Sequence, residues 1–445
     1  SGDPAILGSD EWWAIEDQYY NGQNQSYAGL KIKKGELNSN DPLFNFWDGL
    51  NGGRACYRAI RDCNVFLENI HKVGNDLSEE ESRRWIAEVK TLKAYYHYYL
   101  MRMYGPVPIV KENLPISAGI EEVRVYRDPF DEGIDYIVGL LNEAVPDLPL
   151  QILNISSELG RITQPIALAL KAEILVMAAS PLFNGNPDYK SFTDNRGIPL
   201  FSQEYSREKW EKAAVACKNA IDTSLLAGHD LYEFTKQTNV SDSTKLLMSL
   251  RHVVTDRWNK EIIWTEAKLS MNAYQRATTP MFFIEQHQWM PTDPYMCPTL
   301  RMAELFYTKN GVPIDEDKQF DYANRFSTEP APANHKYYIQ PGYQTAKLNI
   351  GREVRFYANL AFDGAIWFGN GRFKDVGDGV ANEQPWVFQT KKSQAQGKVA
   401  NLRYSLSGYW ARRTSHFESV STSSSSNVIV RSTFPIIRLA DLYLL

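Results

Sequence analysis

The residues best suited to chemistry in this sequence are aromatic and amide side chains gathered in residues 257–298. Sugar rings present C–H faces that stack on indole or phenol rings, while their hydroxyl groups need amide, guanidinium or carboxylate partners. A segment that mixes both kinds of side chain predicts a saccharide-binding surface. The segment contains Trp258, Trp264, Asn272, Tyr274, Gln275, Arg276, Phe282, Phe283, Gln286, Gln288, Trp289 and Tyr295.

Position within the segment separates candidate ligand contacts from core. Trp264 ends the strand-like run of residues 261–264, so we expect it in a core. Trp289 and Tyr295 flank the loop sequence MPTDP and are the best candidates for stacking. The predicted ligand-binding residues are Trp289, Tyr295 and Tyr274 for stacking, Asn272, Arg276 and Gln288 for hydrogen bonding, and Tyr27 as a second choice. The alternative for any single aromatic residue here is the core of an irregular domain.

No motif for catalysis or metal binding is present. The chain lacks G-x-S-x-G, a phosphate loop, H-E-x-x-H and G-x-G-x-x-G, and its seven histidines include no metal-spaced pair. Asp315, Asp317 and Asp321 have the first, third and seventh spacing of a calcium loop, but Phe320 replaces the required glycine and Phe326 the terminal glutamate. We therefore predict a protein that is not an enzyme and has no cofactor, with calcium at this loop as the weaker alternative.

Composition excludes further classes. The 445 residues are 43% hydrophobic and 13% aromatic, and the net charge is -5, with no basic run to bind nucleic acid. The four cysteines (Cys56, Cys63, Cys217 and Cys297) are expected to be free and buried. No stretch approaches the length of a membrane-spanning helix. The chain opens at Ser1 without methionine or signal peptide and stops inside a helix-like sequence, so we expect a trimmed chain that continues beyond Leu445.

A long helix after Ser78 is the predicted centre of packing. Ser78 and Glu81 have the spacing of a capping box, and Gly105-Pro106 ends the helix because proline has no N–H to donate. Its predicted apolar stripe is Trp85, Val89, Leu92, Tyr96, Tyr99 and Met103. His97, in the same helix, is expected to be a hydrogen-bonded core residue.

The other predicted helices form pairs with short connections. Residues 54–70 pair with the Ser78 helix, residues 128–148 pair with 163–179, and residues 207–226 form a third helix. Leu92-Lys93-Ala94 recurs as Leu170-Lys171-Ala172, and both of these helices end before a proline. The pairs are of the general tetratricopeptide type. The predicted apolar face of the third helix is Trp210, Ala213, Ala214, Cys217 and Ile221.

After about residue 229 helical periodicity fades and proline, glycine, asparagine and aromatic residues dominate. We predict strands at residues 261–264 and 355–360, and a short polar-aromatic helix or turn at 9–20. The predicted fold is mainly α, with a tetratricopeptide-like helix-pair scaffold and a large loop-rich α+β lobe. The predicted domains are a scaffold at 1–228, an irregular ligand-binding lobe at 229–433, and the start of a returning helix at 434–445.

Several segments together resemble the SusD/RagB family of outer-membrane nutrient-binding lipoproteins, over nearly the whole chain and in the same order. Residues 92–110, LKAYYHYYLMRMYGPVPIV, resemble its signature helix, and residues 61–70 resemble its c-N-x-F-L-E-N-I helix. Residues 161–184 are similar to its helix ending in A-S-P-L-F-N. Residues 302–311 resemble M-x-D-x-F…D/N-G, and residues 352–361 resemble R-D-P-R-F-Y, although Glu353-Val354 depart from the Asp-Pro.

The resemblance implies a surface-exposed lipoprotein of the outer membrane, anchored through an N-terminal lipidated cysteine that this chain lacks. It implies an oligosaccharide ligand and a TonB-dependent, SusC-like transporter as partner, with no nucleic acid. Ligand-binding residues vary within the family and follow no motif, so none is carried over by match.

Three alternatives remain open at this stage. A peptide ligand would rely on backbone pairing and a wider cleft. A glycoside hydrolase would need two carboxylates at a fixed separation in one cleft. A purely structural scaffold would have no aromatic cleft in the lobe.

Overall fold

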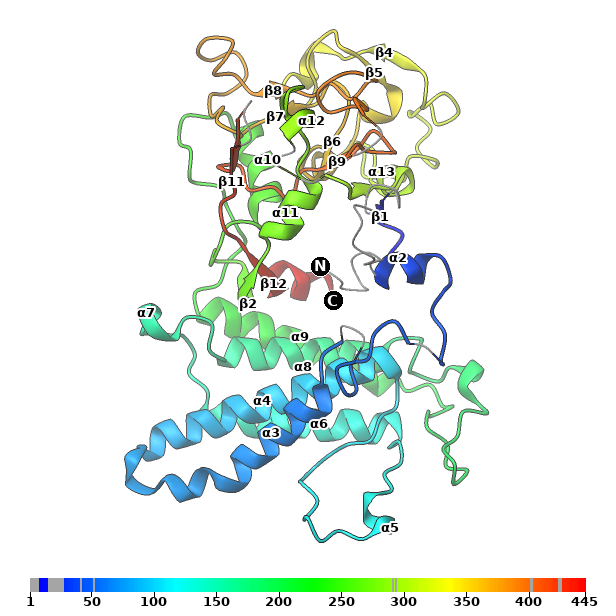
Figure 1. The fold of residues 1–445 in the computed structure, drawn as a ribbon, viewed down its shortest axis with the longest axis vertical. Coiled ribbons are helices and arrows are strands. Elements are labelled where there is room, and N and C mark those ends of the chain that lie inside the picture. Colours follow the sequence, from blue (N-terminus) through cyan, green and yellow to red (C-terminus); the bar gives the residue numbers. More distant parts are fainter. Residues whose placement is uncertain are drawn as a thin grey trace. The chain divides into compact units, whose positions relative to one another are not determined.

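The computed structural model describes residues 8–14, 28–40, 42–50, 53–289, 292, 294–400, 403–422 and 426–445. The chain is 39% helical and 10% strand and divides into two compact units (Figure 1). The helical scaffold comprises Pro42–Leu231, Lys260–Glu266 and Pro435–Leu445, and the loop-rich lobe comprises Ser1–Asp41, Tyr232–Asn259 and Ala267–Phe434. The predicted fold class is confirmed. The predicted domain boundaries stay a prediction.

The scaffold is a series of neighbouring helices. Helix α3 packs on α4, α4 on α6, α6 on α8 and α8 on α9 (Figure 1). Its helices are α3 (Cys56–Asn69), α4 (Glu79–Tyr104), α5 (Ile120–Val123), α6 (Phe130–Ala144), α7 (Ile155–Glu158), α8 (Gln164–Ala179), α9 (Arg207–Leu226) and α15 (Leu439–Leu444). Trp264 is buried in the scaffold core, where its ring meets Tyr95 edge-on at 4.8 Å. Its core role is confirmed.

Helix α4 begins and ends as the sequence predicts. The Ser78 hydroxyl accepts from Glu81 N at 3.2 Å, and the Glu81 carboxylate accepts from Ser78 N at 3.3 Å, which completes the capping box. Gly105 ends the helix with φ 69°, a left-handed conformation that glycine adopts without a steric penalty.

The apolar faces of α4 and α9 differ from the prediction in the same way. In α4, Trp85 and Met103 are exposed, and the fully buried face is Ala87, Thr91, Ala94, Tyr98 and Met101. In α9, Trp210 is 37% exposed, and the buried face is Ala213, Ala216, Ala220 and Ser224. Small residues let the backbones of neighbouring helices approach closely, so they make up the buried face of α9 and share that of α4 with Tyr98 and Met101.

His97 is a satisfied core residue, as predicted. Its Nε2 accepts from Val110 N at 3.2 Å, so Nδ1 carries the proton and donates to the carbonyl of Lys93 at 2.9 Å. Burial lowers the pKa of His97 to about 4, and the ring is neutral at pH 7.

The lobe consists of short helices and two-stranded sheets. Its helices are α2 (Ala28–Lys33), α10 (Asp242–His252), α11 (Asn272–Thr278), α12 (Gln286–Trp289), α13 (Leu300–Leu305) and α14 (Val354–Asn359). Its antiparallel pairs are β1 (Trp12–Trp13) with β3 (Cys297–Pro298), β4 (Thr328–Pro330) with β5 (Gln344–Ala346), β6 (Leu360–Ala361) with β9 (Trp410–Ala411), β7 (Ile366–Trp367) with β8 (Trp386–Val387), and β10 (Val420–Ser421) with β11 (Asn427–Val428).

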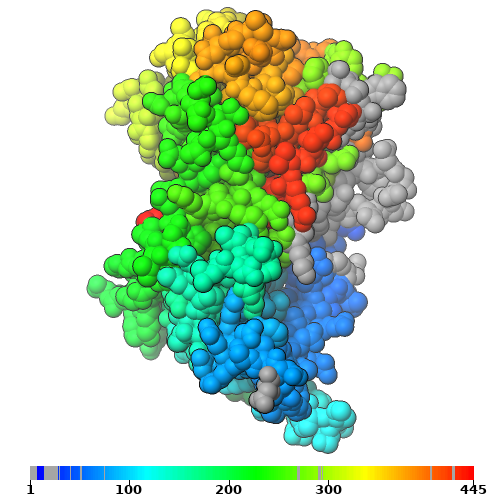
Figure 2. Space-filling model, turned by 90° about the vertical axis from the view of Figure 1, so that its left-hand side faces the viewer, coloured from blue at the N-terminus to red at the C-terminus, as the bar shows by residue number. Residues whose placement is uncertain are grey.

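Aromatic packing and buried polar side chains hold the lobe's irregular backbone. Trp367 stacks on Phe388 at 4.9 Å, and the buried Arg251 lies 4.5 Å from the Trp367 ring and donates to the carbonyl of Phe368 at 2.6 Å. Asp375 accepts from Thr244 Oγ1 at 2.8 Å, which joins the start of α10 to a loop far along the chain. Figure 2 shows these green and orange segments adjacent on one face of the lobe.

Three local predictions are wrong in whole or in part. Of the helix or turn predicted at 9–20, residues 9–11 do form a bend and turn, Trp12 and Trp13 instead form strand β1, and residues 15–20 lie outside the described residues. Residues 354–359 form helix α14, and only Leu360–Ala361 is extended. Residues 434–438 belong to strand β12 (Thr433–Arg438), which pairs with β2 (Ile262–Ser270), and the helix begins at Leu439. In each case tertiary pairing or packing overrides local propensity.

All four cysteines are free, as predicted, and Cys217 is half-buried where the other three are buried. Among the residues that the structure describes, no helix has the length and apolar character to cross a membrane.

Candidate aromatic binding site

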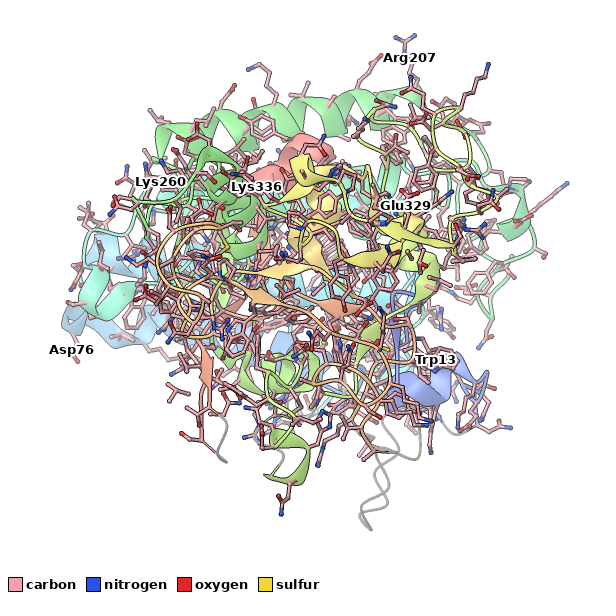
Figure 3. All side chains as sticks on the ribbon, turned by 90° about the horizontal axis from the view of Figure 1, so that it is seen from above. Trp13, Asp76, Arg207, Lys260, Glu329 and Lys336 are labelled. Atoms are coloured by element: carbon pink, nitrogen blue, oxygen red, sulfur yellow. The ribbon has the colours of Figure 1, made fainter. Side chains whose placement is uncertain are left out.

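A cluster of aromatic residues forms in the lobe where strand β1 meets strand β3. Trp12 pairs with Pro298 and Trp13 with Cys297. Neighbouring residues of a strand point to opposite sides, so Trp12 is half-buried and Trp13 is 51% exposed. Figure 3 shows Trp13 beside helix α2, and Lys33 Nζ lies 5.4 Å from the Trp13 ring centroid.

Helix α11 supplies the second side of the cluster. The Tyr274 ring meets the Trp12 ring edge-on, with centroids 5.8 Å apart. The backbone N–H groups of Tyr295 and Met296 both donate to the carbonyl of Ala277 at 3.1 Å, which fixes the following loop against the end of α11. Trp12, Tyr274 and Tyr295 pack on Ala277 and Met296. We call these three rings, together with Trp13 on the other side of strand β1, the aromatic cluster.

The two phenols of the cluster are neutral at physiological pH. Burial raises the pKa of Tyr295 to about 12. Burial also raises the pKa of Tyr274 well above its usual range, with Glu11 adding to the rise and Arg413 opposing it. Half-buried tyrosines of this kind present an apolar ring and an uncharged hydroxyl group.

The predicted polar residues fall into two groups. Arg276 and Gln288 are exposed, and Asn272 is half-buried at the start of α11. By contrast, Gln275 and Gln286 are buried and bind the lobe's own backbone. Gln275 Nε2 donates to Val430 O at 3.0 Å, and Gln286 Oε1 accepts from Phe282 N at 2.7 Å. These two amides are structural, and their inclusion among possible sugar contacts was wrong.

Two predicted residues are not placed by the structure. Trp289 ends helix α12, and its side chain is outside the described residues. Tyr27 also lies outside them, as do Met290, Pro291 and Asp293. The structure therefore brings together Tyr274 and Tyr295, and it adds Trp12 and Trp13.

Sequence reasoning missed these two tryptophans because they lie more than 250 residues before Tyr274 and were assigned to a helix or turn. The available signal was a pair of adjacent tryptophans in a polar stretch, one of which must face solvent if the stretch is extended.

The acidic loop binds its own protein. Asp317 accepts from Thr308 Oγ1 at 2.5 Å and from Asn310 Nδ2 at 2.9 Å, and Asp321 accepts from Lys347 Nζ at 2.9 Å. Over the described ranges no three histidine, cysteine, aspartate or glutamate side chains are grouped to hold a metal ion. A calcium loop needs glycine for its sharp turn, and Phe320 occupies that position. The carboxylate of Asp321 is already paired with Lys347. These residues therefore do not fit calcium.

Comparison with known proteins defines the class. Residues 13–175 match the family model described as "Starch-binding associating with outer membrane", and residues 260–445 match the model described as "SusD family". The two matches cover most of the chain. The chain belongs to the SusD/RagB family.

Three relatives show how far the likeness reaches. A "SusD-like protein" of Bacteroides ovatus (strain ATCC 8483) is 21% identical over 276 residues, which are 60% of this chain and 43% of the relative. The chain thus spans less than half the length of this curated relative. The solved structure of BT4246 is 26% identical, with a TM-score of 0.78 over 98% of this chain and 73% of that one. The SusD-like protein BF3747 from Bacteroides fragilis NCTC 9343 is 21% identical, with a TM-score of 0.65 over 100% and 71%.

Proposed function

We propose that this protein binds oligosaccharides at the bacterial cell surface and delivers them to a TonB-dependent, SusC-like transporter. One observation supports the binding role above others: Trp13 presents an indole to solvent from a strand whose other face is fixed by Trp12 and Tyr274. An exposed indole on a backbone that is held in place is suited to stack on the C–H face of a sugar ring. The family description as starch-binding and associated with the outer membrane agrees with this role.

Polar side chains of α11 and α12 would complete the site. We propose that Arg276, Gln288 and Asn272 hydrogen-bond sugar hydroxyl groups, because α11 and α12 present them near a solvent-facing surface. Tyr274 and Tyr295 support the stacking surface, and Trp289 and Tyr27 stay predicted contacts. One sugar ring stacked on an indole and a few hydrogen bonds give a dissociation constant in the micromolar to millimolar range. Such an affinity suits a protein that must release its ligand to a transporter.

In this proposal the protein is a binding protein and not a hydrolase. We propose the transporter and the N-terminal lipid anchor because the resemblance to the family implies them. Both can be tested by co-purification from outer membranes of the native host and by labelling with a lipid precursor.

The test is affinity gel electrophoresis against plant, host and microbial polysaccharides. Xyloglucan belongs in the panel because one solved protein of this fold was obtained with a xylogluco-oligosaccharide. We expect at least one polysaccharide to retard the protein, and Trp13→Ala to weaken that retardation about tenfold, the loss of roughly 1.4 kcal/mol. The matched control is Trp85→Ala, which removes an indole of 38% exposure from the scaffold.

The outcomes separate the alternatives. Equal retardation of the wild type and Trp13→Ala would remove the aromatic cluster as the site. If alanine at both Trp289 and Tyr295 leaves binding unchanged, neither side chain contributes to the site. No retardation by any glycan, together with binding of a peptide mixture, would favour a peptide ligand, and release of reducing sugar would establish a hydrolase.

A further inference from the structure

A second concave surface of the lobe shares no residue with the aromatic cluster. It lies beside strands β4 and β5 (Figure 1), where Figure 3 labels Glu329 on β4. The ring of Phe320 and the side chain of Ile350 supply its apolar lining. Its volume is about 240 Å³, far above the roughly 10–15 Å³ that a single water molecule needs on the same measure. We call it the polar groove.

The polar side chains of the groove are held in place by the protein itself. Asp317 accepts from Thr308 Oγ1, from Asn310 Nδ2 at 2.9 Å, and from Gln319 N at 2.8 Å. Lys347 Nζ donates to Asp321 at 2.9 Å. Because these contacts exist before any ligand arrives, a ligand would pay little side-chain entropy to use the groups.

These groups retain hydrogen-bonding capacity of both kinds. A carboxylate accepts about four hydrogen bonds, and Asp317 receives the three named above. The ammonium of Lys347 has three donors. The side chains of Lys309 and Gln319, which also line the groove, are exposed to solvent. Paired donors and acceptors beside an aromatic ring match the hydroxyl groups and the C–H face of a pyranose.

The charges of the groove favour a neutral ligand. Three carboxylates (Asp317, Asp321 and Glu329) face two ammonium groups (Lys309 and Lys347), which leaves one negative charge in excess. An anion would be repelled by that excess negative charge. A divalent cation would be repelled by Lys347, whose ammonium group already pairs with Asp321.

We propose that the polar groove is a second saccharide site, which takes one neutral pyranose unit. This inference rests on the proposed glycan binding and extends it. Two sites on one lobe raise the affinity for a polysaccharide that reaches both over that for a short oligosaccharide, without any stronger single contact.

The test uses saturation-transfer NMR with four probes, the methyl glycosides α-glucoside, β-glucoside, β-galactoside and α-mannoside. The full chain with Trp13→Ala is the background for every variant, so that the aromatic cluster contributes as little as possible to the signal. The groove variant adds Lys309→Ala and Gln319→Ala, and the control variant adds Lys318→Ala and Lys336→Ala. All four side chains are exposed, so folding should be preserved, and Lys318 adjoins the groove without lining it.

We expect at least one methyl glycoside to give a signal with Trp13→Ala and with the control variant. The groove variant should weaken that signal about fivefold to tenfold, as expected for the loss of ordinary hydrogen bonds. No signal from any probe, or equal signals from groove and control variants, would overturn the second site. The proposed function fails separately, if no polysaccharide retards the wild type or if Trp13→Ala retains full retardation.

Discussion

The indole of Trp12 meets the phenol of Tyr274 edge-on, with ring planes at 71° and centroids 5.8 Å apart. This contact joins the N-terminal strand β1 to helix α11 within the lobe. Because Trp12 is the neighbour of Trp13 on a two-residue strand, the contact fixes the backbone that presents the exposed indole. The position of the Trp13 indole therefore depends on Trp12 and Tyr274.

The first prediction follows from this contact. Tyr274→Ala should lower the free energy of unfolding by about 2–4 kcal/mol, because a half-buried ring is lost, and should weaken glycan binding at a temperature where the variant is folded. Tyr274→Phe keeps the ring and should preserve both properties. Thermal unfolding and isothermal titration against the polysaccharide found in the gel screen would measure them.

The matched control is Tyr338→Ala, which removes another half-buried tyrosine of the lobe, one that stacks on Tyr357 at 4.4 Å. It should destabilise the protein to a similar degree and leave glycan affinity unchanged. Equal loss of affinity in both variants would mean that general loosening of the lobe, and not the Trp12 contact, is responsible.

The second prediction concerns the start of helix α4. Ser78→Ala removes one acceptor of the capping box and should lower the free energy of unfolding by about 1 kcal/mol. Ser78→Asp keeps an acceptor at this position and should retain most of the stabilisation by the cap. The midpoint of urea denaturation, with an unchanged m-value, measures both changes. Ser82→Ala, one turn further along, is the control and should be near neutral. A neutral Ser78→Ala would show that packing alone sets where the helix begins.

The scaffold shows what sequence pattern can and cannot predict. The capping box at Ser78 and the stop at Gly105 are local, so a few neighbouring residues determine them. The buried face of a helix depends on its neighbours. Ala87 and Ala94 of α4 are fully buried because they let adjacent backbones approach, whereas Trp85, the strongest hydrophobic signal, is exposed. Size, and not only hydrophobicity, selects the residues at a close helix contact.

The candidate site was predictable to a smaller extent. Aromatic and amide composition pointed to the segment that contains Tyr274 and Tyr295, since composition needs no three-dimensional information. It could not separate the exposed Arg276 from the neighbouring Gln275, whose amide is fully occupied by the backbone and by Ser432. Nor could it bring Trp12 and Trp13 to the site, because no local rule predicts pairing over more than 250 residues.

The third prediction uses the neutral His97. Its pKa in the folded protein, about 4, lies below the usual 6.5 of an unfolded chain. The unfolded state therefore binds a proton first as the pH falls. Stability from the neutral ring is fully present above about pH 6.5 and is lost as the pH falls toward 4, by up to about 3 kcal/mol. His97→Gln should flatten the pH dependence of unfolding over this range.

Denaturant titrations at pH 7.5, 6, 5 and 4 would give that dependence. The control is His71→Gln, because His71 is exposed at the end of the α3 region and its replacement should leave the slope unchanged. Parallel pH profiles for the wild type and His97→Gln would contradict the assignment of His97 as a buried neutral group.

The fourth prediction has the opposite sign and concerns Glu173 of helix α8. Burial raises the pKa of this carboxyl to about 7, with Asp441 adding to the rise and Arg102 opposing it. The folded state therefore holds the proton while the unfolded state releases it above about pH 4.5, and stability falls as the pH rises from 4.5 to 7. Glu173→Gln keeps the shape without the charge and should stabilise the protein by about 2 kcal/mol at pH 8 and by almost nothing at pH 4.

Glu211→Gln, the control on the exposed side of α9, loses only a surface ion pair with Arg207 and should change stability by less than about 1 kcal/mol at either pH. A gain for Glu173→Gln that is equal at pH 8 and pH 4 would show that packing, and not the ionisation of this half-buried carboxyl, is the cause.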